Sequence, residues 1–162
     1  MLPQRVLAGL GLAATSVSAI DARFFSNNNC KGSTWLACNN WNPGPCCYTT
    51  NQEYSVGGGF FAIPTSWSIV CQLWTTTGCS TLRATGLNYG RDTVCYTAPV
   101  DRQRGFAEGL SYYFNGKKRE VNQDPTECQR ANILHLDDGS EYDLAGLDDA
   151  AYDDVVSSLV KI

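Results

Sequence analysis

Short runs of apolar residues, separated by turns rich in glycine, asparagine and proline, fill residues 22–121 of the chain. The runs are rich in β-branched and aromatic residues, and none repeats its apolar residues with the period of an α-helix. The pattern therefore predicts short strands. The predicted strands are RFFS, STWLAC, CCY and SVGGGFFAIP in the first half, and SIVCQLW, STLRA, TVCYT and GLSYYF in the second.

The second half of this region repeats the first at an offset of 49 residues. The matched positions are Phe24 with Leu73, Phe25 with Trp74, Cys30 with Cys79, and Cys46 with Cys95. A slip of one further residue brings Gly109 into line with Gly59 in the fourth strand. We therefore expect two similar β units, over about residues 22–70 and 71–121, within one β region spanning residues 20–121.

Two strong hairpin signals follow the repeats. Asn115–Gly116 predicts a turn that returns through KKREV, and Asp138–Gly139 predicts a turn between ANILHL and EYDL. Residues 122–162 are thus expected to add a hairpin, followed by a helix that packs on the β region.

The predicted helix shows apolar residues four apart on one face and acidic residues on the other. Its apolar residues are Leu147, Ala151, Val155 and Leu159. Asp148 and Asp149 fall in the first turn, where they suit the positive end of the helix dipole. Residues 137–162 hold eight acidic residues and one lysine, a net charge of 1 − 8 = −7, so the acidity of the chain is concentrated there.

The first 19 residues have the features of a secretory signal peptide: a basic residue, the apolar run from Val6 to Ala14, and small residues at Val17 and Ala19. A membrane anchor is the alternative, but a spanning helix needs about 20 apolar residues. We expect a secreted protein with no transmembrane segment.

Eight cysteines lie beyond that segment, an even number that predicts up to four disulfides in an oxidising compartment. They are Cys30, Cys38, Cys46, Cys47, Cys71, Cys79, Cys95 and Cys128. A zinc site is the alternative, but His135 is the only histidine and no CxxC pair exists.

The first motif resembles a βγ-crystallin Greek-key motif. The resemblance rests on an aromatic strand, a polar turn with Gly32, a cysteine-led strand, and Ser55 before the last strand. Two tandem motifs resemble one βγ-crystallin domain, over about residues 22–114. The resemblance implies a disulfide-stapled β-sandwich in which the two motifs pack as sheets. The second copy departs from the pattern, with Thr81 in place of Gly32 and Arg104 in place of Ser55.

The symmetry of the two motifs suggests that Cys30 pairs with Cys46 and that Cys79 pairs with Cys95. Cys128, one of the four cysteines left over, would tie the C-terminal segment to the sandwich. Eight cysteines allow about 105 pairings, so this pairing is a hypothesis.

Many microbial βγ-crystallins bind calcium just before the last strand of a motif. The matching segment here is NQEYSV, where Asn51, Glu53 and Ser55 are the candidate ligands. A polar turn that closes a hairpin is the alternative interpretation. No other cofactor is indicated.

Trp41 lies in NNWNPGP, an expected loop, where its ring could stack on a sugar while the amides of Asn39 and Asn40 bind hydroxyl groups. The early cysteines also resemble the opening of a hevein-type chitin-binding framework. A tryptophan that caps a small core is the alternative.

Basic residues gather at Arg102, Arg104 and residues 117–119, but no nucleic-acid-binding signature accompanies them, so we expect no nucleic-acid partner. Neither a Ser/His/Asp nor a Cys/His arrangement can be assembled around His135. We expect a non-catalytic protein that binds an extracellular target, such as a glycan or a microbial or host surface. Its role would be structural, defensive or killer-toxin-like; a lectin-like module and a host-directed effector are the alternatives.

Overall fold

The computed structural model describes residues 19–51, 54–97, 106–116 and 127–160. The predicted signal peptide, apart from Ala19, and the KKREV strand lie outside these residues. The strands are β1 (Ile20–Phe25), β2 (Trp35–Trp41), β3 (Cys46–Tyr48), β4 (Gly57–Phe61), β5 (Ile69–Trp74), β6 (Leu82–Leu87), β7 (Val94–Thr97), β8 (Gly109–Phe114), β9 (Cys128–Arg130), β10 (Ile133–His135) and β11 (Glu141–Asp143), and the helix is α1 (Asp149–Val160).

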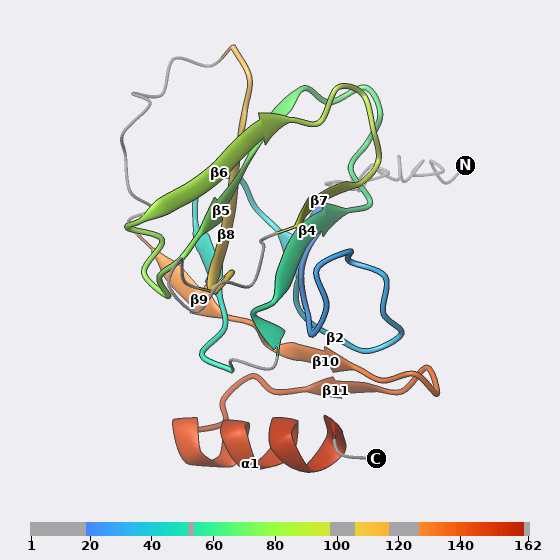
Figure 1. The fold of residues 1–162 in the computed structure, drawn as a ribbon, viewed down its shortest axis with the longest axis vertical. Helices are drawn as coiled ribbons and strands as arrows, with labels where there is room; N and C mark the ends of the chain where they lie inside the picture. Colours follow the sequence, from blue (N-terminus) through green and yellow to red (C-terminus); the bar gives the residue numbers. More distant parts are fainter. Residues whose placement is uncertain (1–18, 52–53, 98–105, 117–126, 161–162) are drawn as a thin grey trace, which may run out of the picture.

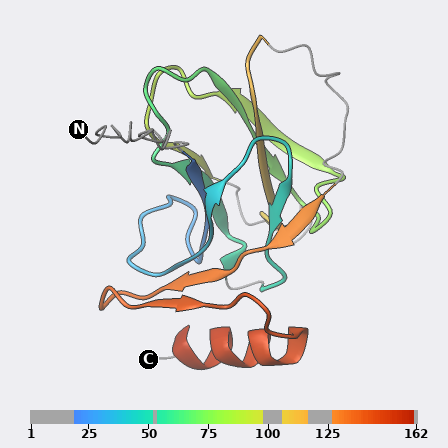
Figure 2. The ribbon, with the colours of Figure 1, turned by 180° about the vertical axis from the view of Figure 1, so that it is seen from behind.

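The strands form two sheets, which pack as a sandwich with α1 beside β11 (Figures 1 and 2). The first sheet has the order β11-β10-β2-β1-β4-β7, and the second has the order β6-β5-β8-β3-β9. The predicted mainly β fold is thus confirmed, with two tandem Greek-key motifs, a C-terminal hairpin and one helix.

Each motif gives its third strand to the sheet of the other motif. The first sheet holds β1, β2 and β4 of the first motif beside β7 of the second, and the second sheet holds β5, β6 and β8 beside β3. We call this arrangement the strand exchange. The expectation that each motif forms a sheet of its own is wrong in this detail, because β3 pairs with β8 and β7 pairs with β4.

Matching hydrogen bonds show how the two motifs correspond. The amide of Val56 donates to the carbonyl of Phe25, and the amide of Glu108 donates to that of Trp74. Phe25 and Trp74 are 49 residues apart, whereas Val56 and Glu108 are 52 apart. The slip in the fourth strand is therefore three residues rather than one, and the counterpart of Gly109 is Gly57, not Gly59.

The core lies between the sheets and follows the period-2 alternation of the strands. Ile20, Ala22 and Phe24 of β1 are fully buried, and their counterparts at an offset of 49 are Ile69, Cys71 and Leu73 of β5, which are also buried. Each large apolar side chain buried in this way contributes about 1.5–3 kcal/mol. At the centre of the sandwich, Phe60 meets Tyr112 edge-on at 6.0 Å.

The C-terminal segment extends the sandwich. The Asp138–Gly139 hairpin is confirmed as β10–β11, and β10 adds to the edge of β2. β9 was not expected; it pairs in parallel with β3.

The helix packs through a face that differs from the predicted one. Tyr152 and Val156 are fully buried in the main core, while Ala151 and Val155 are only partly buried. Asp148 caps the N-terminus, since its side chain accepts a hydrogen bond from the amide of Ala151 at 2.9 Å. No described helix has the length and apolarity needed to cross a bilayer.

Candidate functional site

Three disulfides link six of the cysteines, and the predicted pairing is wrong. Cys30 bonds to Cys95, Cys46 bonds to Cys79, and Cys38 bonds to Cys47. The four cysteines of the repeat do pair with one another, but across the motifs instead of within them. The cause is the strand exchange, which carries β3 and β7 away from the loops of their own motifs.

The first two disulfides are related by the same repeat that relates the motifs. Cys79 is the counterpart of Cys30 at the offset of 49, and Cys95 is the counterpart of Cys46. Each bond therefore links an exchanged strand to the β-hairpin loop of the motif that receives that strand. Cys30 and Cys79 share a left-handed backbone, with φ of 51° and 49°. This conformation is costly for a residue other than glycine.

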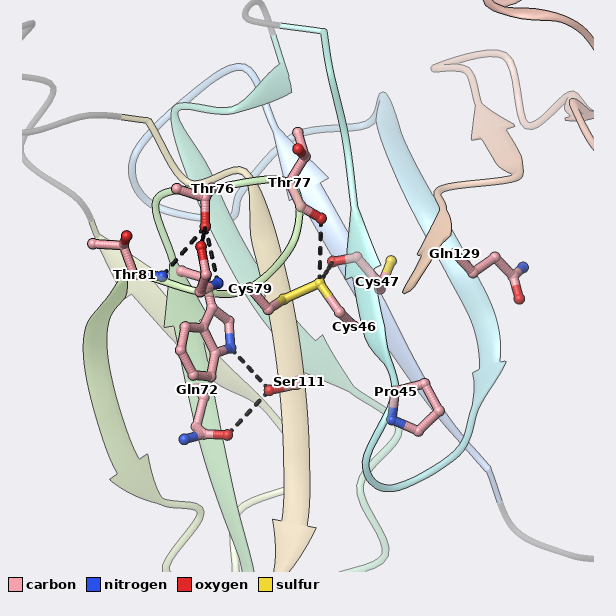
Figure 3. Close-up of a disulfide and its surroundings, with 12 residues drawn as sticks. Pro45, Cys46, Cys47, Gln72, Thr76, Thr77, Cys79, Thr81, Ser111 and Gln129 are labelled. Carbon is pink, nitrogen blue, oxygen red and sulfur yellow. Dashed lines mark hydrogen bonds between the residues drawn. A yellow bond between two sulfur atoms is a disulfide. The ribbon is translucent and has the colours of Figure 1, made fainter. Parts of the chain in front are cut away.

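Figure 3 shows the Cys46–Cys79 disulfide and the loop over it. The side chain of Thr76 organises this loop by accepting hydrogen bonds from the amides of Ser80 and Thr81. Beneath the loop, the indole of Trp74 donates to Ser111 at 2.9 Å. The matching Asn27 loop also bonds to itself, as the amide of Asn29 donates to the Asn27 side chain, so its asparagines serve the scaffold.

Cys71 and Cys128 are free thiols, so the expected fourth disulfide is not formed. Cys71 is fully buried at the position that Ala22 occupies in the first motif, and burial raises the pKa of its thiol to about 12. A thiol with that pKa is a poor nucleophile at neutral pH. Cys128 is exposed on β9, which joins the C-terminal segment to the sandwich through hydrogen bonds to β3 and not through a disulfide.

Trp41 is not in an exposed loop. It ends β2 with 6% of its surface exposed, and its indole donates to the carbonyl of Pro45 at 3.2 Å. Tyr112 donates to the carbonyl of Trp41 at 2.8 Å. The ring caps the core and offers no open face on which a sugar could stack.

The two candidate asparagines near Trp41 have structural counterparts in the second motif. Asn39 matches Asn88, which is 1% exposed and bonds through its side chain to the backbone of Ile69 and Trp67. Asn40 is exposed, and its left-handed φ of 53° is repeated at Tyr89. The structure therefore does not bring Trp41, Asn39 and Asn40 together as a sugar site.

The candidate calcium ligands are only partly described. Asn51 is half-buried and Ser55 is 1% exposed, whereas Glu53 lies outside the described residues. Across residues 19–51, 54–97, 106–116 and 127–160, no three His, Cys, Asp or Glu side chains converge on a point that could hold a metal ion. Calcium binding at Asn51, Glu53 and Ser55 stays a prediction.

A ladder of side chains crosses the outer face of the first sheet. It consists of His135 on β10, Trp35 on β2, Arg23 on β1 and Phe61 on β4, and we call it the aromatic ladder. His135 stacks on Trp35 with ring centroids 3.9 Å apart. The Arg23 guanidinium lies 4.6 Å from the Trp35 ring and 4.7 Å from the Phe61 ring.

Carboxylates contact two members of the aromatic ladder. Asp21 accepts from Arg23 at 2.9 Å, and Glu141 lies 3.3 Å from Nδ1 of His135. The strand order β10-β2-β1 places His135 and Arg23 on opposite sides of Trp35, so both faces of the indole are covered. The ladder holds the C-terminal hairpin against the first motif. It includes His135, the only histidine of the chain.

Among the ring and cation contacts of the described residues, none forms such a ladder on the second sheet. Gln72 takes the place of Arg23 at the offset of 49. Phe24 pairs with Leu36 and Leu73 pairs with Ala84, so Ala84 matches the core residue Leu36, and Leu82, which pairs with Trp74, stands nearest to the place of Trp35. Within the described residues the sheet ends at β6, and no strand there corresponds to β10. The aromatic ladder and the β10–β11 hairpin therefore distinguish the first sheet from the second. Sequence reasoning missed the ladder because its members come from four strands, and only the sheet order brings them together.

Arg130 anchors the helix. Its guanidinium donates to the side chain of Asp149 and to the carbonyl of Leu147, and it lies 4.0 Å from the ring centroid of Tyr152. A cleft of about 270 Å³ lies beside it, between the β9–β10 junction and the turn at residues 144–146. The buried Oδ1 of Asn132, which lines this cleft, has no hydrogen-bond partner.

These features define a disulfide-stapled β-sandwich of two tandem Greek-key motifs that exchange their third strands. The chain belongs to the ARB_05566_N family, described as an N-terminal domain, whose model matches residues 21–132. The match begins in β1 and ends just before β10, so the β10–β11 hairpin and α1 lie beyond it. No curated protein and no solved structure shows a significant match to the chain.

Proposed function

We propose that this protein is secreted and non-catalytic and that it acts by binding an extracellular target, in a structural, defence or killer-toxin-like role. The observation that carries the proposal is the pair of symmetry-related disulfides, Cys30–Cys95 and Cys46–Cys79. Disulfides of this kind persist in oxidising compartments and resist unfolding and proteolysis there. We further propose that the sandwich is of the βγ-crystallin type, which the tandem Greek-key arrangement supports.

Two side chains support a role in binding over one in catalysis. His135 is committed to its stack on Trp35 and its contact with Glu141. Cys71 is buried and its pKa is raised to about 12. The lectin alternative loses its support because the ring of Trp41 is buried.

The test begins with expression of the full chain in a secreting eukaryotic host. We expect the protein in the medium, with its N-terminus at Ile20 and two free thiols by mass spectrometry. Retention of the uncut chain inside the cells would contradict secretion. The purified protein is then applied to cultured microbes, where growth inhibition or retention on the cell surface is measured against a reduced and alkylated control.

The two matching sheets provide a matched pair of variants for the binding assay. Arg23→Gln gives the first sheet the residue that the second sheet carries, and Gln72→Arg makes the reverse change in the second sheet. If the aromatic ladder face makes the contact, Arg23→Gln weakens surface retention and Gln72→Arg leaves it unchanged. Equal retention by both variants and the unaltered protein would place the contact elsewhere.

A further inference from the structure

Three cysteines gather on the outer face of the second sheet. Cys46 in β3 is the register partner of Cys128 in the parallel strand β9. Partner residues of neighbouring strands point to the same face of a sheet, so the Cβ atoms of Cys128 and Cys46 lie side by side on one face. Cys46 is already bonded to Cys79. A nucleophile and a disulfide are therefore neighbours.

The direction of approach suits thiol–disulfide exchange. Cys79 lies over β8, since a Cβ on Gly109 would come within 2.6 Å of its sulfur. In the order β8-β3-β9, Cys79 and Cys128 then lie on opposite sides of Cys46. Figure 3 shows Cys79 on one side of Cys46 and Gln129 of β9 on the other. Attack on a disulfide sulfur proceeds from the side opposite the leaving sulfur.

The backbone does not need to move far for the new bond. Neighbouring strands lie about 4.8 Å apart, and disulfides span Cα–Cα distances of about 4.4–6.8 Å. The Cα atoms of Cys46 and Cys79 are 6.0 Å apart. Cys46 can therefore bond to either neighbour while β3 keeps its place in the sheet. Cys128 is exposed, so its thiol is free to turn toward Cys46.

We propose that the Cys46–Cys79 disulfide isomerises to Cys46–Cys128. The thiolate of Cys128 attacks Sγ of Cys46, the bond from Cys46 to Cys79 breaks, and Cys79 leaves as a thiolate that takes up a proton. One disulfide is lost and one is formed, so no oxidant or reductant is consumed. The exchange converts a link between the two motifs into a link between β3 and the C-terminal extension, while Cys30–Cys95 keeps the motifs joined.

Peptide mapping of the unreduced full-length protein tests the exchange. Trypsin releases residues 120–130 as a peptide whose only cysteine is Cys128. Cys46 and Cys79 lie together in the peptide of residues 32–83. Only the thiolate attacks, and partial burial raises the pKa of the Cys128 thiol, so the protein is incubated in alkaline buffer without added thiol. Samples are quenched with N-ethylmaleimide over time, and the monomer is isolated before digestion.

We expect residues 120–130 to begin as a maleimide-labelled peptide and to become disulfide-linked to residues 32–83, while Cys79 gains the label. Chymotryptic digestion places the link in residues 42–48, which hold both Cys46 and Cys47. If Cys38 stays unlabelled, Cys47 has kept its own disulfide and the linked residue is Cys46. Residues 120–130 that stay labelled throughout, or that link only to a second copy of themselves, would overturn the proposal.

Two variants serve as controls. Cys128→Ser keeps Cys79 unlabelled if the proposal is correct, and labelling of Cys79 in this variant would overturn it. Cys71→Ala places in the second motif the residue that the first motif has at Ala22, and it leaves the exchange rate unchanged. The map requires no knowledge of the target, so its outcome is independent of the proposed binding function.

Discussion

Replacing Cys30 and Cys95 together by alanine is expected to lower the free energy of unfolding by about 3.5 kcal/mol. The estimate comes from the loop that this disulfide closes when the other two are intact. The shortest path runs from Cys30 to Cys38, across to Cys47, on to Cys46, across to Cys79, and on to Cys95. It contains 8 + 1 + 16 = 25 residues, which gives about 3.5 kcal/mol of loop-closure entropy.

This disulfide isolates the entropic effect because it lies at the surface. Both Cys30 and Cys95 are only partly buried, so alanine leaves little cavity. At about 2–4 °C per kcal/mol, the midpoint of thermal unfolding should fall by about 7–14 °C. The denaturant m-value should rise as well, because an unfolded chain with one link fewer exposes more surface.

The assay is denaturant unfolding under non-reducing conditions, with Cys71→Ala as a control that removes a sulfur without removing a link. A loss below about 1 kcal/mol with an unchanged m-value would refute the reasoning, since it would mean that the bond does not restrict the unfolded chain.

Four further predictions follow from single contacts. Gly109→Ala should lower the free energy of unfolding by about 1–3 kcal/mol, because a Cβ at this position would come within 2.6 Å of the Cys79 sulfur. Gly78→Ala, where a Cβ would meet nothing within 4 Å, should be nearly neutral in the same thermal unfolding assay. A double-mutant cycle of Trp35→Ala and His135→Ala should give a coupling energy of about 0.5–1.5 kcal/mol, and additive losses would show that the stack at 3.9 Å does not stabilise the hairpin. Burial raises the pKa of Cys71 from 9.0 to about 12, so the folded state holds this proton more tightly than the unfolded state does. The resulting contribution to the free energy of unfolding is complete below pH 9 and is lost as pH rises toward 12. Cys71→Ala should therefore flatten this decline when unfolding is measured as a function of pH. Calorimetry with calcium on the chelated protein should show heat and a raised melting temperature if the NQEYSV segment binds the ion, and the absence of both would remove that prediction.

Local patterns in the sequence are sufficient to predict most of the strands. The alternation in β1 and β5, the Asp138–Gly139 turn and the helix all arise from neighbouring residues. β9 could not be found in this way, since its three residues carry no apolar pattern and are held by β3 from a distant part of the chain. The buried face of α1 was misplaced by one position because the acidic face alone does not show where Tyr152 points.

The disulfides show why a correct repeat led to a wrong pairing. The offset of 49 identified the four related cysteines, but a two-fold repeat permits pairing within motifs and across them equally well. Only the strand exchange distinguishes the two, and it is a property of how the sheets assemble. The same limit applies to Trp41, whose flanking prolines and glycine predicted a loop although its ring is drawn into the core beside Tyr112.

The strand exchange also implies a mode of assembly. A single motif would form a three-stranded sheet with an unfilled place beside β4 and a third strand with no sheet of its own. Two identical copies would complete each other as a two-fold symmetric dimer. Joining the copies through the segment between β4 and β5 turns that encounter of two chains into an intramolecular step, at an effective concentration set by a short linker. In a single chain the two motifs do not have to be identical, so one sheet can carry the aromatic ladder and the C-terminal hairpin while the other does not.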